Sequence, residues 1–290
     1  MKKVGNFFLM FVPSIVVLSF QYFAMFFIMG ICMLFLFAKG QGFMEAYNSM
    51  VEFLLNPDVN LTLLLMFSTM TICSCGLLCH YRYGGGIVPP EKKEFNPLQF
   101  AGILLIVPGA QILSNLMVSV IAALMPSALT AYEELLEASG MGDELSIAMI
   151  LYSVILAPIG EELAFRGLTL RIGRKALPFW AANLIQAFLF GVFHMNIIQG
   201  SYAFVLGLIL GFVCEKGGSI YYAIFLHFLF NFWGTIIAPF VAELTHPAAI
   251  LLFFAAVIAC TIIGLLLFIK GMKQKEAKRL RPIQLENVHA

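Results

Sequence analysis

Runs of apolar residues recur along the whole chain and are separated by short polar connections. Most are about as long as the 20 residues that a helix needs to cross a bilayer, and they carry few charges. We predict spans at residues 12–38, 59–79, 98–125, 146–169, 179–196, 200–214, 218–241 and 248–269. The sixth span is short, as suits a helix surrounded by others. The pattern indicates an all-α polytopic membrane protein with about eight transmembrane helices.

Composition supports this class and excludes several partners. The chain is 61% hydrophobic and 11% charged, whereas an average soluble domain is about 25% charged. The net charge is +1, and neither a basic stripe nor a nucleotide-binding motif occurs, so we expect no nucleic-acid and no nucleotide partner. The first apolar stretch is too long for a cleavable signal peptide. The lipid bilayer is therefore the first expected partner.

The placement of basic residues predicts the orientation of the spans. Connections rich in Lys and Arg alternate with acidic or neutral ones, which is the asymmetry expected between cytoplasmic and outer loops. Eight spans with both termini in the cytoplasm satisfy every basic cluster. We predict a multi-pass protein of a bacterial plasma membrane, with an amphipathic helix at residues 128–140 on its outer surface. Residues 271–290 are predicted to form a disordered basic tail that contacts anionic lipid.

The chain divides into three predicted regions. Residues 1–145 form an N-terminal transmembrane region of three helices and their loops. Residues 146–241 form a core that holds the candidate catalytic residues. Residues 242–290 comprise the last transmembrane helix and the cytoplasmic tail.

Two adjacent glutamates, Glu161 and Glu162, lie inside an apolar helix and are followed by Arg166. An ionisable side chain at membrane depth costs several kcal/mol and is by default a functional candidate. Glu162 and Arg166 are four residues apart, so we predict a buried ion pair that supports the structure. Glu161 points about 100° away from Glu162 and has no partner within its helix. We therefore predict Glu161 to be the chemically active carboxylate.

Two later spans each contribute one histidine, His194 and His227, and Asn231 lies four residues beyond the second. Counted at about 1.5 Å per residue, Glu161, His227 and Asn231 lie roughly 13–19 Å from the cytoplasmic ends of their helices, and His194 roughly 20 Å. The four side chains thus fall near one depth, in a cavity that we predict to open to the cytoplasm. Glutamate, histidine and asparagine match a reaction in which water attacks a carbonyl.

Two readings of this set remain open. In the first, Glu161, His194 and His227 bind zinc, leaving a fourth position for water. In the second, Glu161 and His194 deprotonate water without a metal, and His227 joins Asn231 in stabilising the oxyanion. Every residue is on a different helix except His227 and Asn231, so the spacing does not decide between them.

These residues resemble the motifs of a known family. Glu161-Glu162-x-x-x-Arg166, Phe190-x-x-x-His194 and His227-x-x-x-Asn231 are similar, in this order, to the three motifs of the CPBP family, the CAAX protease and bacteriocin-processing intramembrane proteases. The resemblance covers residues 146–235. It implies an eight-helix bundle with a conical cavity open to the cytoplasm, with Glu161 as general base or metal contact, His194 as its partner, and His227 with Asn231 completing the site.

The expected function is that of an intramembrane endopeptidase, similar to a CAAX prenyl protease 2, acting on a membrane-associated protein or peptide precursor. Bacterial members of the family process bacteriocin leaders and pheromones or confer self-immunity. A non-catalytic scaffold or bacteriocin-immunity protein of the same family is therefore one alternative. A proton-coupled transporter is another, although the chain has neither an internal repeat nor paired broken helices.

Overall fold

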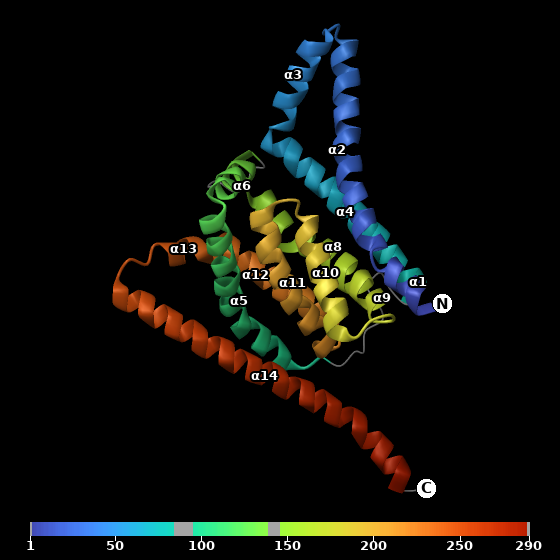
Figure 1. Ribbon diagram of the computed structural model, residues 1–290, viewed down its shortest axis with the longest axis vertical. Helices are drawn as coiled ribbons and strands as arrows, with labels where there is room; N and C mark the ends of the chain where they lie inside the picture. The colour runs from blue at the N-terminus through green and yellow to red at the C-terminus, as the bar shows by residue number, and fades with distance from the viewer. Residues whose placement is uncertain (1, 84–94, 139–145, 289–290) are drawn as a thin grey trace.

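The computed structural model describes residues 2–83, 95–138 and 146–288, and side chains up to residue 277 (Figure 1). Every regular element in these ranges is helical, which confirms the all-α polytopic class. The first half of the chain contains α1 (Lys2–Leu9), α2 (Val12–Ala38), α3 (Phe43–Leu54), α4 (Pro57–Tyr83), α5 (Pro97–Leu124) and α6 (Pro126–Ala138). The helix that carries the two glutamates is a continuous run of α7 (Ile147–Leu151), η1 (Tyr152–Leu156), α8 (Ala157–Glu162), η2 (Leu163–Leu170) and α9 (Arg171–Gly173), in which η1 and η2 are π-helical. The remaining elements are α10 (Phe179–Phe193), α11 (Ile197–Gly217), α12 (Ile220–Phe232), the π-helical η3 (Trp233–Ile237), α13 (Ala238–Ala242) and α14 (Pro247–Val288).

Seven helices of the described residues are long and apolar enough to cross a membrane. They correspond to seven of the predicted spans. The remaining one, predicted at residues 179–196, is α10, which has only 15 residues. At about 1.5 Å per residue it reaches roughly 22 Å, less than the roughly 30 Å of a hydrocarbon core. Pro178 precedes it and a tight turn at Met195 ends it, so α10 and α11 form a hairpin.

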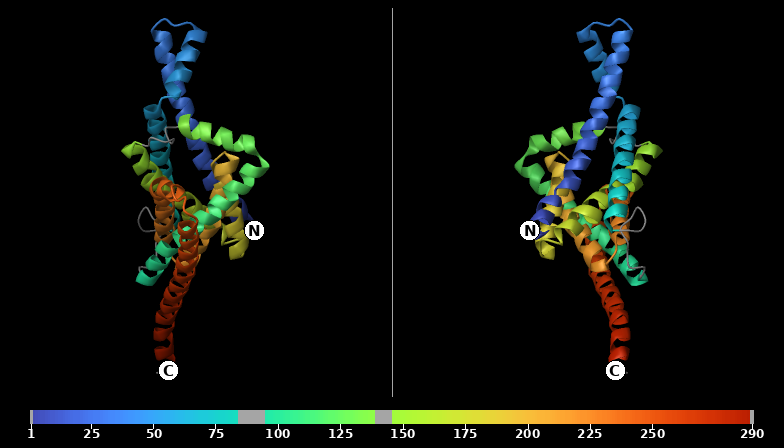
Figure 2. Two further views of the ribbon diagram at one scale, coloured as in Figure 1. Left: turned by 90° about the vertical axis from the view of Figure 1, so that its left-hand side faces the viewer. Right: turned by 90° about the vertical axis from the view of Figure 1, so that its right-hand side faces the viewer.

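The packed centre of the molecule consists of the glutamate-bearing helix, α10, α11, α12 and the start of α5 (Figure 1). Phe165, Phe190, Leu210 and Tyr222 are buried there, along with Ile103 of α5. Figure 2 shows α2 and α3 extending beyond this centre at one end and the last part of α14 extending beyond it at the other. The polar residues of interest all come from the centre, where helices surround them on several sides.

Three short or terminal elements refine the predicted picture. The helix predicted at residues 128–140 is present as α6 up to Ala138, and its last two residues lie outside the described part of the chain. The helix α3 was not predicted, because the residues between the first two predicted spans were interpreted only as a connection. The disordered tail was also a wrong prediction, since α14 continues as a helix to Val288. Its polar half is rich in Lys, Glu, Gln and Leu, which favour helix, and the buried Lys275 donates a 2.7 Å hydrogen bond to the carbonyl of Gly217.

The α5–α14 contact is the most extensive helix pair in the described structure and depends on two glycines. A Cβ added at Gly102 would lie 2.6 Å from the carbonyl oxygen of Gly264, and one added at Gly264 would lie 2.7 Å from that of Gly102. Small residues permit such close backbone approach between membrane helices.

We therefore expect Gly102→Ala to lower the thermal unfolding temperature in detergent, because the two backbones must separate. Gly30→Ala in α2 is the matched control, since a Cβ there meets nothing within 4 Å. It should leave the unfolding temperature unchanged or slightly higher, because alanine favours helix over glycine. Equal unfolding temperatures for the two variants would contradict this account of the α5–α14 contact.

Candidate active site

Glu161 and Glu162 lie on α8, a short α-helical segment between the π-helical turns η1 and η2. Ser146 caps the N-terminus of the whole run by accepting a hydrogen bond from the backbone of Met149 at 3.1 Å. Pro158, at the start of α8, lacks the backbone N–H that a regular helix would use. π-Helical turns inside α-helices occur frequently at functional sites. The helix is therefore irregular on both sides of its two carboxylates.

The predicted Glu162–Arg166 pair is present. Nη1 of Arg166 lies 2.8 Å from Oε1 of Glu162, and neither side chain is exposed to solvent. Nη2 of Arg166 donates to the carbonyl of Gly207 on α11 at 3.3 Å. Arg166 is thus held by its own helix and by α11, and it compensates a carboxylate that burial alone would make very costly.

His227 lies between the two glutamates. Its Nδ1 donates a 2.8 Å hydrogen bond to Oε1 of Glu162, and its Nε2 lies 3.7 Å from Oε2 of Glu161. The contact to Glu162 fixes the ring orientation, because the carboxylate can only accept. Glu161, which has no partner in its own helix, therefore faces His227 of α12. Arg166, Glu162, His227 and Glu161 form a continuous chain of charged and polar groups.

His194 reaches this group less directly. It is the C-cap residue of α10, and its Nδ1 donates to the carbonyl of Phe190 at 2.8 Å, so that Nε2 remains available. The ring of Phe190 contacts the rings of His194 and His227 edge-on, at centroid distances of 4.9 and 5.8 Å. The guanidinium of Arg166 lies over the same ring at 4.5 Å. Phe190 therefore joins the three predicted motifs at one point.

Asn231 forms a hydrogen bond to the neighbouring helix. Its Nδ2 donates to the backbone carbonyl of Ser153 in η1 at 2.8 Å. Asn231 thus connects α12 to the glutamate-bearing helix, and the oxyanion role expected of its amide stays a prediction.

A buried polar network behind Arg166 was missed from the sequence. Gln186 donates to Asn183 at 2.8 Å and to the carbonyl of Gly207 at 2.9 Å, and Asn183 donates to the carbonyl of Leu208 at 3.0 Å. Both side chains are fully buried on α10. Asn183 and Gln186 lie on the same helical face as Phe190 and His194. This spacing could have identified them as site residues, because polar residues at this depth require partners.

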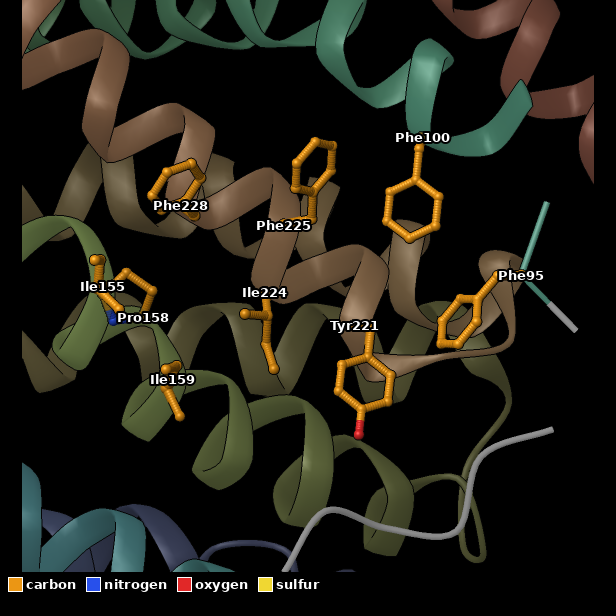
Figure 3. Close-up of a pocket in the computed structure, with 9 residues that line it drawn as sticks. All are labelled: Phe95, Phe100, Ile155, Pro158, Ile159, Tyr221, Ile224, Phe225 and Phe228. Atoms are coloured by element: carbon orange, nitrogen blue, oxygen red, sulfur yellow. The ribbon is translucent and has the colours of Figure 1, made fainter. Parts of the chain in front are cut away.

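An apolar groove lies beside the site, between the glutamate-bearing helix and α12 (Figure 3). Its volume is about 510 Å³. Phe95 and Tyr221 lie toward one end and Ile155 and Phe228 toward the other (Figure 3). The lining residues are Phe95, Phe100, Ile155, Pro158, Ile159, Tyr221, Ile224, Phe225 and Phe228. Two of its walls are thus the helices that also supply Glu161 and His227, and Phe100 of α5 belongs to a third.

The donor types suit zinc, since Glu161, His194 and His227 supply one carboxylate and two imidazoles. Their placement does not form a ready three-ligand site, because no group of three such side chains in the described residues is arranged to hold a metal ion. His227 and Glu161 face each other, whereas His194 contacts the group through Phe190. A bound zinc would supply a polarised water at these residues.

Comparison with known proteins identifies one family. The family model described as type II CAAX prenyl endopeptidase Rce1-like matches residues 143–233. This segment is about a third of the chain. Searches of curated proteins and of solved structures found no match. All six polar residues of the site fall inside the matched segment, so the site lies in the part of the chain that is similar to the type II CAAX prenyl endopeptidases.

Proposed function

We propose that the protein is an intramembrane endopeptidase that hydrolyses a peptide bond in a membrane-associated protein or peptide precursor. One observation carries the proposal. Glu161 is held against His227, and His227 is held in turn by the buried Glu162–Arg166 pair, all within spanning helices of the Rce1-like segment. A carboxylate and an imidazole at membrane depth are costly, so their presence in spanning helices indicates a function. The arrangement offers a base and proton donors where a scissile carbonyl would bind.

In the metal-free form of the proposed reaction, Glu161 accepts a proton from water as the water oxygen attacks the carbonyl carbon. Nε2 of His194 accepts the second hydrogen bond of that water and so orients it. His227, when it carries a second proton, donates from Nε2 to the oxyanion of the tetrahedral intermediate. Collapse of the intermediate breaks the C–N bond, and Glu161 returns its proton to the leaving amine.

The apolar groove supports a substrate with large hydrophobic side chains. Its lining residues, among those that the structure describes, carry no charge, and it follows the same two helices as the catalytic carboxylate and imidazole (Figure 3). Burying apolar surface there contributes about 25 cal/mol per Å². We infer that residues flanking the scissile bond bind in this groove and hold the bond near Glu161.

Comparative peptidomics of the host tests this function. Cells with the wild-type protein and cells with Glu161→Ala should differ in a small set of peptides, with a precursor accumulating in the variant. The purified wild-type protein should then cleave that precursor and the purified variant should not. Unchanged peptides together with an unchanged phenotype would favour a non-catalytic scaffold or immunity role. Proton-driven substrate flux into proteoliposomes would favour a transporter.

The alternative proposal is that Glu161, His194 and His227 hold zinc, in which case the two imidazoles would bind the metal and not the water or the oxyanion. We expect about one zinc per active chain by elemental analysis, loss of hydrolysis after chelation, and recovery on addition of zinc. His194→Ala should lower the zinc content as well as the activity, which separates metal binding from a purely acid–base role. Full activity in a preparation shown to be metal-free would remove zinc from the proposal and leave Glu161 with His194 as the base.

A further inference from the structure

Asn96, the residue before α5, is hydrogen-bonded to three helices through separate atoms. Its Oδ1 accepts from the backbone N–H of Leu98 at 2.9 Å and so caps α5. Its own backbone N–H donates to the hydroxyl of Tyr222 on α12 at 2.9 Å. Its Nδ2 donates to Oε1 of Gln274 at 2.9 Å and to the carbonyl of Gly271 at 3.3 Å, both on α14. Capping needs only the first of these bonds, so the others fix the start of α5 against α12 and α14.

The same part of α14 is also tied to the turn that precedes α12. The buried Lys275 donates from Nζ to the carbonyl of Gly217 at 2.7 Å and lies over the ring of Tyr222 at 5.2 Å. A Cβ added at Gly271 would lie 2.6 Å from Cγ of Gln99, so α14 and α5 approach each other closely here. The polar part of α14 is therefore packed onto the starts of both α5 and α12.

Phe95, the residue before Asn96, forms one end of the apolar groove together with Tyr221 (Figure 3). The centroid of its ring lies 5.7 Å from that of Tyr221 and 6.0 Å from that of Phe100. About half of Phe95 is exposed. Its ring contacts thus hold it only in part, and the hydrogen bonds of the next residue add to its placement.

We propose that Asn96 and Gln274 are positioning residues: they hold Phe95 in the wall of the groove and so determine how tightly the groove binds apolar residues of a substrate. This inference rests on the proposed peptidase function. Both residues lie outside the segment that the family model matches. Tyr221 is six residues before His227 on α12, roughly 9 Å along the helix. The effect should therefore fall on substrate binding and spare the chemical step.

Substitutions of Gln274 test this role, because its side chain is exposed and its loss should leave the protein folded. Gln274→Leu removes the acceptor for Asn96, and the loss of one such hydrogen bond should raise KM for a cleaved precursor by about three-fold or more. The value of kcat should change by less than about two-fold, as expected when only binding is weakened. Gln274→Glu keeps an acceptor oxygen and should retain the native KM. Glu276→Leu is the matched control, since Glu276 is exposed on the same helix, and it should change neither constant.

A double-mutant cycle shows whether the effect passes through Phe95. Phe95→Ala should itself raise KM, because it removes part of the groove wall. In that background Gln274→Leu should raise KM further by less than about two-fold, since the two changes act on one contact. An equal rise in KM from Gln274→Leu in both backgrounds, or a fall in kcat without a change in KM, would overturn the proposal.

Fluorescence quenching follows the position of residue 95 without any need for activity. In Phe95→Trp, the added indole should become more accessible to acrylamide when Gln274→Leu is introduced, but not when Gln274→Glu or Glu276→Leu is introduced. The signal is taken as the difference from the same protein without Phe95→Trp, because Trp180 and Trp233 also fluoresce. Unchanged quenching in Gln274→Leu would refute the positioning of Phe95. Increased quenching together with no hydrolysis by the wild-type protein would support that positioning and count against the proposed function alone.

Discussion

Glu161→Gln is expected to reduce peptide hydrolysis by at least about a hundred-fold while leaving the protein folded. Glutamine keeps the shape of the side chain but cannot accept the proton of the attacking water, and general base catalysis contributes about 10²–10⁴-fold. The fold should survive because the contact of Glu161 with His227, at 3.7 Å, is longer than a hydrogen bond, and His227 keeps its 2.8 Å bond to Glu162. The measurements are kcat on a cleaved precursor and thermal unfolding in detergent.

Glu45→Gln provides the control for this prediction. Glu45 is an exposed carboxylate on α3, a helix outside the packed centre, and its neutralisation should alter neither activity nor stability. A purified Glu161→Gln protein with full activity would remove Glu161 from the role of base. Glu162 would then become the candidate, since it is the other carboxylate in contact with His227.

The largest loss of stability is expected for Arg166→Ala. Glu162 would remain fully buried without its guanidinium, and removing one partner of a buried ion pair costs about 3–5 kcal/mol. The variant also gives up the hydrogen bond to Gly207 and the contact with Phe190. Glu162→Gln should destabilise for the related reason that it leaves Arg166 buried and uncompensated. Both variants should unfold at lower temperatures than Glu161→Gln does.

Arg174→Ala is the matched control for Arg166→Ala. Arg174 pairs with Glu215 at 2.9 Å, but about a third of each side chain is exposed. Such a pair contributes about 0–1 kcal/mol, because water screens it. We therefore expect a much smaller fall in unfolding temperature for Arg174→Ala. If Glu161→Gln proved the least stable of the set, the division between a structural Glu162 and a chemical Glu161 would be wrong.

The fold class follows from the sequence alone because a membrane admits few solutions. Apolar runs must form helices whose backbone groups are satisfied internally, so their length and spacing predict the spans directly. The predicted 179–196 span shows the limit of this reasoning. Composition marks it as apolar, but whether an apolar helix crosses the bilayer or ends within a hairpin depends on the turn at Met195 and on the helices around it. The polar end of α14 shows the same limit, because its contact with Gly217 comes from a distant part of the chain.

Within the site, the sequence determined what is local. Glu162 and Arg166 are one turn apart on the same helix, so their pairing follows from helical periodicity and is observed. The sequence also identified His194 and His227 as unusual groups for an apolar segment. It could not assign their partners, because each partner lies on another helix and depends on the rotation and register of two packed surfaces.

Only the tertiary structure decided how the three motifs meet. It placed His227 between both glutamates, put Phe190 in contact with both histidines, and directed Asn231 to the backbone of Ser153. Residue types and spacing are the same whether an amide faces a substrate or a carbonyl of a neighbouring helix. The contact of Asn231 with Ser153 depends on how α12 packs against the glutamate-bearing helix, which the spacing of residues within either helix does not reveal.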